Sequence, residues 1–371
     1  MKTNCIGVIF SNIGDNMVRD LTEQRCIGSI PFGGRYRMID FPLSAMVHAG
    51  ITKVGISTRY NYRSLMDHLG SGKAWDLSRK NGGIYLFPPY SNMASSTNAT
   101  RLLELAAMMP FLENSKEDYV VLCDCDTVFN FDLSQMIEEH IRSGADITFG
   151  YVRGKKPRGA GGRMVFELDH SKKIKDILID PEQTEDCDYA INISVHNRSL
   201  LIKTVKDAMS RNYTTLSRDV YQRGLSTLDM RGYRLSGYVR VIDSLSTYLS
   251  ANEDLLNAQV RDSLFCADRP VLTKVRDDAP ARYAVGGKVK NSLVADGCLI
   301  AGKVENCILF RGVHVGKEAN LSNCVIMQDT IIGDKANLSY VITDKNTEIS
   351  PGRTLIGFDS YPAYITKNSL V

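Results

Sequence analysis

Two patterns of hydrophobic and polar residues divide the chain. Up to about residue 265, short apolar runs alternate with stretches in which apolar residues recur at helical spacing. Such an alternation predicts an α/β fold, in which a mostly parallel sheet has its strands connected by helices. The runs predicted to be strands are 5–10, 51–58, 83–87, 119–125, 146–152, 173–179, 189–196 and 232–242. The stretches predicted to be helices are 42–49, 62–69, 97–112, 133–143, 199–209 and 244–258.

From about Arg269 the helical periodicity gives way to a repeat. The tetrapeptide 306–309, NCIL, returns as NCVI at 323–326, and Leu321 returns as Leu338, each 17 positions later. Coils of about three hexapeptide units each predict a parallel β-helix, in which every turn buries an aliphatic residue beneath the next. We therefore expect two domains, an α/β domain over 1–265 and a β-helix over 266–371.

Composition and charge exclude several classes of protein. A hydrophobic content of 43% with 23% charged residues is typical of a folded chain with a full core. The net charge of +3 comes from basic residues spread along the chain, so we expect no nucleic-acid partner. No apolar run has the length of a membrane span, and the nine scattered cysteines suit a reducing compartment. These features predict a cytoplasmic protein with no membrane contact.

Two places in the α/β region could carry chemistry. The first predicted strand leads into the loop 11–16, where many α/β proteins bind nucleotide phosphates. A phosphate loop needs several glycines and a nearby cation, whereas this loop has one glycine, Gly14, followed by Asp15. The second place is the end of the predicted strand 119–125, where Asp124 and Asp126 would reach the ligand-binding edge of the sheet.

The segment 31–44 identifies a family. It reads PFGGRYRMIDFPLS and closely resembles the signature of bacterial glucose-1-phosphate adenylyltransferases, also called ADP-glucose pyrophosphorylases. The resemblance implies a Rossmann-like nucleotidyltransferase domain followed by a left-handed β-helix that serves subunit contacts and allostery. It also implies a reaction in which ATP and glucose 1-phosphate give ADP-glucose and pyrophosphate. That reaction needs Mg²⁺ between carboxylates and cations on the triphosphate.

Most of the charged positions of that family are lost in this chain. The resemblance places three loop glycines at Asn12, Ile13 and Asp15, the triphosphate-binding Arg at Met17, the active-site Lys at Ile27, the sugar-phosphate Glu and Lys at Ile179 and Asp180, and a second metal-binding Asp at Val241. The adenine-side motif falls near 96–100, where no acid remains. An aspartate in place of a phosphate-binding glycine or lysine repels the substrate, and the apolar replacements supply no charge.

Four charged residues of the family pattern remain. Asp126 matches the metal-binding Asp of the family, so it is either a retained Mg²⁺ ligand or a carboxylate that only caps the strand end. Arg25, Arg35 and Arg37 surround the PFGG turn, in a region that contributes to an anionic activator site in the family. The alternative for these arginines is a solvated surface cluster.

The combined pattern resembles the GlgD-type regulatory subunits, which accompany a catalytic GlgC-type adenylyltransferase subunit. We expect a regulatory, catalytically impaired subunit in glycogen biosynthesis that requires no cofactor of its own. We expect it to work in a heterotetramer or a homo-oligomer and to respond to an anionic metabolite. One alternative is an active nucleotidyltransferase with a rearranged site built on Asp124, Asp126 and arginines from the loop after Gly70. Another is a hexapeptide-repeat acyltransferase, for which His314 is the only histidine in the repeats.

Overall fold

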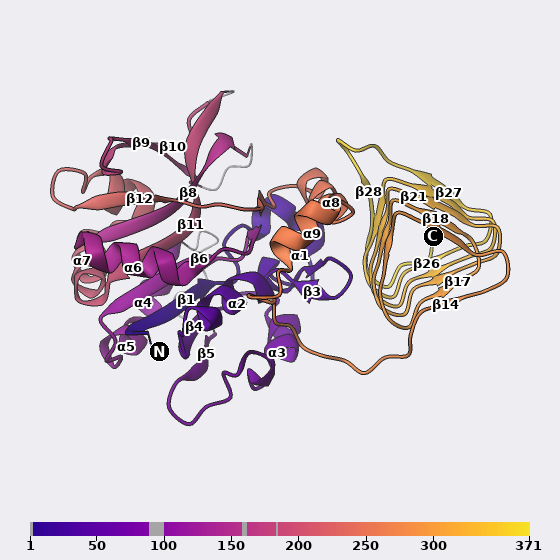
Figure 1. The fold of residues 1–371 in the computed structure, drawn as a ribbon, viewed down its shortest axis with the longest axis horizontal. Coiled ribbons are helices and arrows are strands. Elements are labelled where there is room, and N and C mark those ends of the chain that lie inside the picture. The colour runs from indigo at the N-terminus through magenta and orange to yellow at the C-terminus, as the bar shows by residue number, and fades with distance from the viewer. Residues whose placement is uncertain (1–2, 89–99, 158–161, 183–184) are drawn as a thin grey trace.

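The computed structural model describes residues 3–88, 100–157, 162–182 and 185–371, which form an α/β domain and a β-helix beside it (Figure 1). The central sheet contains β1 (Cys5–Phe10), β4 (Lys53–Ser57), β5 (Gly83–Phe87), β6 (Tyr119–Asp124), β8 (Ile147–Lys155), β9 (Met164–Leu168), β10 (Ile174–Ile179), β11 (Asp186–Asn197) and β12 (Met230–Arg234). The order β6-β1-β4-β5 is parallel, and β11 joins this part to β8, β9 and β10 through antiparallel pairs.

Helices cover the sheet, and smaller elements extend its edge. The α-helices are α1 (Arg19–Thr22), α2 (Asp40–His48), α3 (Arg63–Leu69), α4 (Arg101–Ala107), α5 (Met109–Glu113), α6 (Leu133–Ser143), α7 (Arg198–Ser210), α8 (Leu245–Asp254) and α9 (Ala258–Leu264). The short helical segments are η1 (Asp15–Val18), η2 (Ile27–Ser29), η3 (Lys73–Trp75) and the π-helix η4 (Leu216–Gln222). Two small sheets pair β2 (Pro31–Phe32) with β3 (Tyr36–Arg37), and β7 (Thr127–Phe129) with β13 (Val239–Val241).

The central strand β1 shows why the sheet lies in the middle of the domain. All of its residues are buried. Ile9 belongs to one hydrophobic core cluster, whereas Ile6, Val8 and Phe10 belong to another. Because successive side chains of a strand point to opposite faces, the sheet separates two apolar layers.

Several predicted elements are confirmed, and others are wrong. The strand Cys5–Phe10 and the helix Leu133–Ser143 have the predicted bounds. The predicted helix 97–112 was wrong in being continuous, because the chain breaks between α4 and α5 just before Pro110, whose nitrogen cannot donate a helical hydrogen bond. The predicted strand 232–242 was also wrong, because Gly237, with φ of 88°, separates β12 from β13 in another sheet.

The C-terminal domain is a β-helix with three faces. One face contains β14 (Arg282–Tyr283), β17 (Leu299–Ile300), β20 (His314–Val315), β23 (Ile331–Ile332) and β26 (Glu348–Ile349). The second contains β15 (Lys288–Lys290), β18 (Lys303–Glu305), β21 (Asn320–Ser322), β24 (Asn337–Ser339) and β27 (Thr354–Ile356). The third contains β16 (Leu293–Val294), β19 (Ile308–Leu309), β22 (Val325–Ile326), β25 (Val341–Thr343) and β28 (Ala363–Ile365). All strand pairs between coils are parallel, as the repeat predicts.

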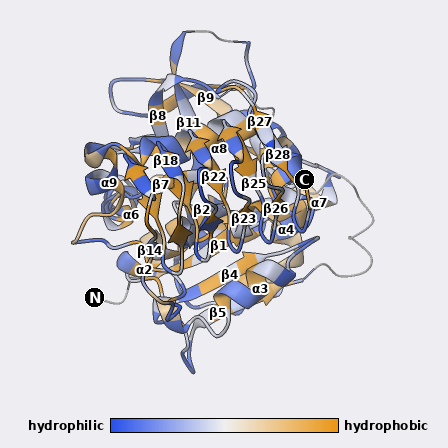
Figure 2. Cartoon of the chain, turned by 90° about the vertical axis from the view of Figure 1, so that its right-hand side faces the viewer, coloured by the Kyte–Doolittle hydropathy of each residue, from blue (hydrophilic) through white to orange (hydrophobic). Residues whose placement is uncertain are grey.

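The repeat seen in the sequence is the stacking interval of most coils, although some pairs between early coils, such as Leu293 and Ile308, are 15 residues apart. Asn320 pairs with Asn337 and Leu321 with Leu338, each 17 residues apart. Asn306, Asn323 and Tyr340 stand at equivalent corners with φ between 52° and 53°. Asparagine tolerates this left-handed conformation, which turns the chain between faces. Figure 2 shows hydrophobic colour along β22 and β25, with hydrophilic turns between the strands.

The third face of the β-helix packs against the α/β domain. Its outward residues Ile308, Val325 and Ile342 are buried in the same cluster as the core of the α/β domain, whereas Leu309 and Ile326 fill the interior of the coils. The two domains therefore share a continuous apolar core, and the predicted fold class is confirmed. Within the described residues, no helix is long and apolar enough to cross a membrane.

Candidate functional site

The sequence-predicted positions meet where β1 and β6 end. Gly14, with φ of 102°, lies at their centre: a methyl group added to it would lie 3.1 Å from Met17 Cε, 3.3 Å from Ile27 Cδ1 and 3.7 Å from Asp126 Cβ. Because these contacts come from three separate segments, the fold brings together the loop after β1, the start of η2 and the end of β6. This edge of the sheet is the ligand-binding edge of doubly wound domains.

The loop after β1 uses its own polar groups. The Asp15 carboxylate accepts hydrogen bonds from the Ile27 backbone N–H at 2.7 Å and from the Asn12 side-chain amide at 2.8 Å. Asn12 also donates to the Tyr60 carbonyl oxygen and accepts from the Arg59 backbone N–H. The Asp15 carboxylate therefore occupies the Ile27 backbone N–H, which would otherwise be available to bind a phosphate. Burial raises the pKa of Asp15 from 3.8 to about 7.

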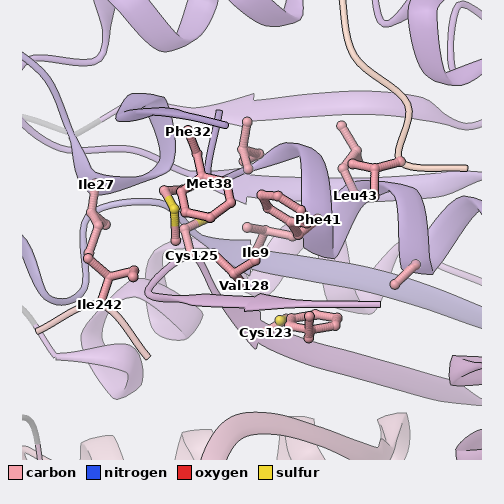
Figure 3. Close-up of a cluster of buried hydrophobic side chains, with 14 of the residues drawn as sticks. Ile9, Ile27, Phe32, Met38, Phe41, Leu43, Cys123, Cys125, Val128 and Ile242 are labelled. Carbon is pink, nitrogen blue, oxygen red and sulfur yellow. The ribbon is translucent and has the colours of Figure 1, made fainter. Parts of the chain in front are cut away.

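The two lost cations are replaced by apolar packing. Ile27 is fully buried and belongs to the same core cluster as Ile242, which lies beside it in Figure 3. Met17 lines the wall of a cavity together with Val241. Ile13, at the second glycine position, packs against the other core cluster. None of these side chains can neutralise a phosphate.

Asp126 is paired with an internal cation. Arg163 Nη2 lies 2.7 Å from Asp126 Oδ2, and both side chains are almost inaccessible, at 2% and 3% exposure. The other carboxylate oxygen, Oδ1, accepts a hydrogen bond from the Thr127 hydroxyl at 2.7 Å. Arg163 Nη1 donates to the Ala190 carbonyl oxygen. No sequence signal indicates Arg163, because the residues around a charged position do not reveal a partner 37 positions away.

Asp180, the charge-reversed position, supports this arrangement. Its carboxylate accepts hydrogen bonds from the backbone N–H groups of Gly162 at 2.8 Å and Arg163 at 2.9 Å. Asp180 itself has φ of 47°, which directs the chain out of β10 immediately after Ile179. The carboxylate therefore fixes the backbone that carries the Arg163 guanidinium, instead of binding a sugar phosphate.

Asp124 is neutralised in the same way. Its carboxylate accepts hydrogen bonds from the guanidinium of Arg101, with Nε 2.9 Å from Oδ1, at the start of α4. Val241 is buried and pairs in register with Thr127, so the second acid position lies next to Asp126 but offers no oxygen ligand from its side chain. Mg²⁺ prefers several oxygen ligands in an octahedral arrangement. The described residues do not fit it, and no cluster of three His, Cys, Asp or Glu residues occurs among them.

A cavity of about 810 Å³ lies beside the residues described above, between the two domains. Its α/β wall includes Met17, Val241 and Asp243, with Lys155 and Lys156 at the end of β8. The β-helix contributes the segment 360–362. The volume is that of a small-molecule site, and such sites often lie between domains. The part of the predicted adenine-side region that spans 96–99 lies outside the described residues, and Thr100 caps the start of α4.

The predicted effector arginines lie at the domain interface. Arg25 is 3% exposed and forms an ion pair of 2.7 Å with Asp344 of the β-helix, while Arg25 Nη1 has no hydrogen-bond partner in the described parts of the chain. Arg37 donates to the backbone oxygen and hydroxyl of Ser64. Arg35 is exposed, with its guanidinium over the Tyr36 ring.

The structure adds Lys345 to this group, which the sequence did not indicate. Burial, followed by repulsion from Arg37 and Arg25, lowers the pKa of the Lys345 ammonium from 10.5 to about 7. Asp344 offsets only part of the positive charge, because one carboxylate faces three cations. The same carboxylate also accepts a hydrogen bond from the Tyr364 hydroxyl at 2.8 Å. We call Arg25, Arg37 and Lys345 the basic cluster. Its excess of positive charge, on the buried Arg25 and the half-buried Arg37 and Lys345, suits an anion.

Comparison with known proteins agrees with this architecture. Residues 16–235 match the family model described as nucleotidyl transferase, and residues 275–362 match the GlmU-like C-terminal hexapeptide model. The chain is 36% identical to the glycogen biosynthesis protein GlgD of Bacillus subtilis over 98% of this chain and 95% of that protein. It is 35% identical to GlgD of Geobacillus stearothermophilus, covering 86% and 83% respectively. A glucose-1-phosphate adenylyltransferase of Clostridium perfringens is 28% identical over 86% of this chain and 83% of its own length.

Proposed function

The chain belongs to the nucleotidyltransferase family that includes the GlgD proteins and the glucose-1-phosphate adenylyltransferases, and we propose that it acts in glycogen biosynthesis as a regulatory, catalytically impaired subunit. In this proposal, a GlgC-type partner converts ATP and glucose 1-phosphate to ADP-glucose and pyrophosphate. The chain described here changes the rate of that partner or its response to an effector, within a heterotetramer.

The observation that carries the proposal is the buried ion pair of Asp126 with Arg163. Nucleotidyl transfer needs a divalent cation held by carboxylates. Here the Arg163 guanidinium lies 2.7 Å from the Asp126 carboxylate, which would hold the metal. The position of the family's second metal-binding aspartate is Val241, which has no carboxylate. Releasing one member of a buried pair leaves an uncompensated charge, which costs about 3–5 kcal/mol. The ion pair between Asp126 and Arg163 therefore opposes metal binding at this site.

We further propose that the basic cluster, with Arg35 at its exposed side, binds an anionic metabolite effector. The orphaned Arg25 Nη1 and the lowered pKa of Lys345 support this, because an added anion would relieve the repulsion among three cations. Arg37→Gln should weaken the response of the mixed subunits to inorganic phosphate. The matched control is Arg19→Gln, which removes an exposed arginine outside the cluster.

Pyrophosphate release from ATP, Mg²⁺ and glucose 1-phosphate tests the main proposal. The purified chain is assayed alone and mixed with the GlgC-type subunit of the same cell, with that subunit alone as the control. We expect no turnover by the chain alone, and a changed rate or effector response in the mixture. An unchanged partner over a full titration of this chain would contradict the regulatory role.

An active enzyme with a rearranged site is the alternative. It would have to use Asp124 or Asp126, and these carboxylates are bound to the half-buried Arg101 and the buried Arg163 respectively. Turnover by the isolated chain at an ordinary enzymatic rate would establish this alternative. It would contradict the proposal that the chain is catalytically impaired.

A further inference from the structure

The last coil of the β-helix contains an insertion. Equivalent residues of the preceding coils are 15 or 17 positions apart, as for Leu293 and Ile308 or for Asn320 and Asn337, whereas Val341 pairs with Ala363, 22 positions later. The additional residues form a tight hairpin at Phe358–Tyr361, closed by two backbone hydrogen bonds of 3.1 Å between these two residues. Insertions in a repeat lie on one face of a solenoid, which is often the face that binds.

The base of the hairpin is fixed on the coil beneath it. The Gly357 backbone N–H donates to the Ser339 carbonyl oxygen at 2.8 Å, and the Ala363 N–H donates to the Tyr340 carbonyl oxygen at 3.0 Å. A Cβ at Gly357 would lie only 2.4 Å from the Tyr340 carbonyl oxygen, so only glycine lets the chain leave the coil so close to its neighbour. The hairpin therefore starts and ends at defined points.

The tip of the hairpin, in contrast, is weakly held. One hydrogen bond, from the exposed Ser246 hydroxyl at the start of α8 to the Asp359 carbonyl oxygen at 2.9 Å, joins it to the α/β domain. Phe358 and Tyr361 are 68% and 81% exposed, although Tyr361 lines the 810 Å³ cavity. In Figure 1 the yellow end of the chain extends from the last coil towards α8. Tyr361 lies at the mouth of the cavity, and Phe358 lies on the same short hairpin. Two large uncovered aromatic side chains on a hairpin beside a cavity suit a segment that closes over it.

The other end of the same segment reaches the basic cluster. Tyr364 follows Ala363 in β28, and its hydroxyl donates to Asp344 Oδ2 at 2.8 Å. The second Asp344 oxygen lies 2.7 Å from Arg25 Nη2. Only Pro362 and Ala363 thus separate Tyr361, which lines the cavity, from Tyr364, which contacts the counter-ion of the cluster.

We propose that the segment Gly357–Tyr364 is a strap that couples the basic cluster to the interdomain cavity. An anion at the cluster competes with Asp344 for Arg25, which frees the Asp344 side chain to move together with the Tyr364 hydroxyl bonded to it and so shifts the strap over the cavity. The role of the anion in this coupling rests on the proposed function, because it requires the proposed effector site. The connection between the Tyr364–Asp344 hydrogen bond and the rest of the strap does not depend on that site. The basic cluster and the cavity both contact this one covalent segment. A longer network of residues is therefore not needed to couple them.

Hydrogen exchange of the full-length chain, without any ligand, tests the link. Tyr364→Phe removes only the hydroxyl. Because one hydrogen bond is lost, we expect exchange to become about fivefold faster in the strap and in the cavity wall 239–250. Tyr283→Phe, which removes an exposed hydroxyl from the first coil, is the control and should change neither segment.

A second variant tests the link from the opposite end. Ser246→Ala removes the contact at the hairpin tip and should speed exchange in the strap while leaving the coils 299–349 protected. Unchanged exchange at 239–250 in Tyr364→Phe, or the same change in Tyr283→Phe, would overturn the proposal. Because the partner assay is separate, a chain that fails to regulate would refute the proposed function without affecting the exchange result.

Discussion

At the scale of single residues, polar groups that could bind a substrate or a metal are bonded to other groups of the same chain. Asp15 takes the Ile27 backbone N–H, Arg163 pairs with Asp126, and Asp180 fixes the backbone of Arg163. The lost cations are replaced by apolar side chains, and the polar groups that remain have found partners within the chain. Buried polar groups without partners are costly, so such compensation is expected once a ligand no longer supplies them.

Asp126→Asn separates regulation from catalysis. The variant leaves the Arg163 guanidinium without its carboxylate, so we expect a loss of about 3–5 kcal/mol in the free energy of unfolding. Stimulation of the partner per folded chain should stay largely intact, because the proposed role needs no metal at Asp126. The mixed pyrophosphate assay, run after circular dichroism has verified the fold, checks this. A collapsed stimulated rate in a folded variant would contradict it, and Asp20→Asn, an exposed carboxylate, is the control.

Asp15 should make stability depend on pH. The pKa of Asp15 is about 7 in the folded chain against an ordinary 3.8, so between these values the folded state holds a proton that the unfolded state has lost. Stability therefore falls as pH rises through this window, by up to about 1.4 kcal/mol per pH unit. Urea unfolding of Asp15→Asn at pH 5 to 7 should show a smaller slope than the native chain.

Some slope should remain in that variant, because burial also raises the pKa of Glu104 to about 7. An identical slope in both proteins would mean that Asp15 keeps an ordinary pKa. Asp20→Asn again serves as the control, since its exposed carboxylate should leave the slope unchanged.

At the scale of elements, short segments between regular strands decide what the molecule can bind. Lys345 follows β25 and faces Arg25 and Arg37 from the α/β domain. The strap interrupts the last coil, and β13 brings Val241 beside β7. The regular coils mainly supply the surface that holds these segments in place.

Sulfate binding should report the state of Lys345. With a pKa lowered to about 7, the folded ammonium loses its proton above that pH, whereas a bound anion favours the charged form. Binding therefore takes up a proton, and the affinity should fall by up to about tenfold per unit as pH rises above 7. Sulfate does not titrate in this range. Calorimetric titration of Lys345→Met should show weaker binding without this pH dependence, whereas Lys317→Met, on the exposed β-helix surface, should behave as the native chain. Equal pH dependence in both variants would exclude Lys345.

At the scale of the whole molecule, the shared apolar cluster makes the two domains one folding unit. Ile308, Val325 and Ile342 project from the β-helix into the core cluster that contains Ile9 and Leu249 of the α/β domain. The buried Arg25–Asp344 pair crosses the same boundary. A change at one domain can thus reach the other without a flexible linker in between.

We expect one cooperative thermal transition for the native chain and two for Val325→Asp. The new carboxylate would be buried without a partner between the domains, which separates them while leaving the interior of the coils packed. Differential scanning calorimetry distinguishes the two cases. Asn320→Asp, on the exposed face of β21, is the control. A single transition shifted to lower temperature in Val325→Asp would show that the domains do not unfold separately.

The sequence by itself determined what depends on local periodicity and on residue type. It was sufficient for the α/β alternation, the bounds of β1 and α6, the stacking interval of 17 residues, and the absence of cations at Met17 and Ile27. It failed where a local break overrode a periodic run, at Met108 before Pro110 and at Gly237.

Only the tertiary structure decided which charged groups meet. Asp126 and Arg163 are 37 positions apart, and Arg25 and Asp344 are 319 apart. No periodic signal connects such pairs, because their contact depends on strand register and domain docking, which the hydrophobic pattern specifies only collectively. The sequence therefore identified which charges were missing, and the packing of distant segments determined which partners the remaining charges have.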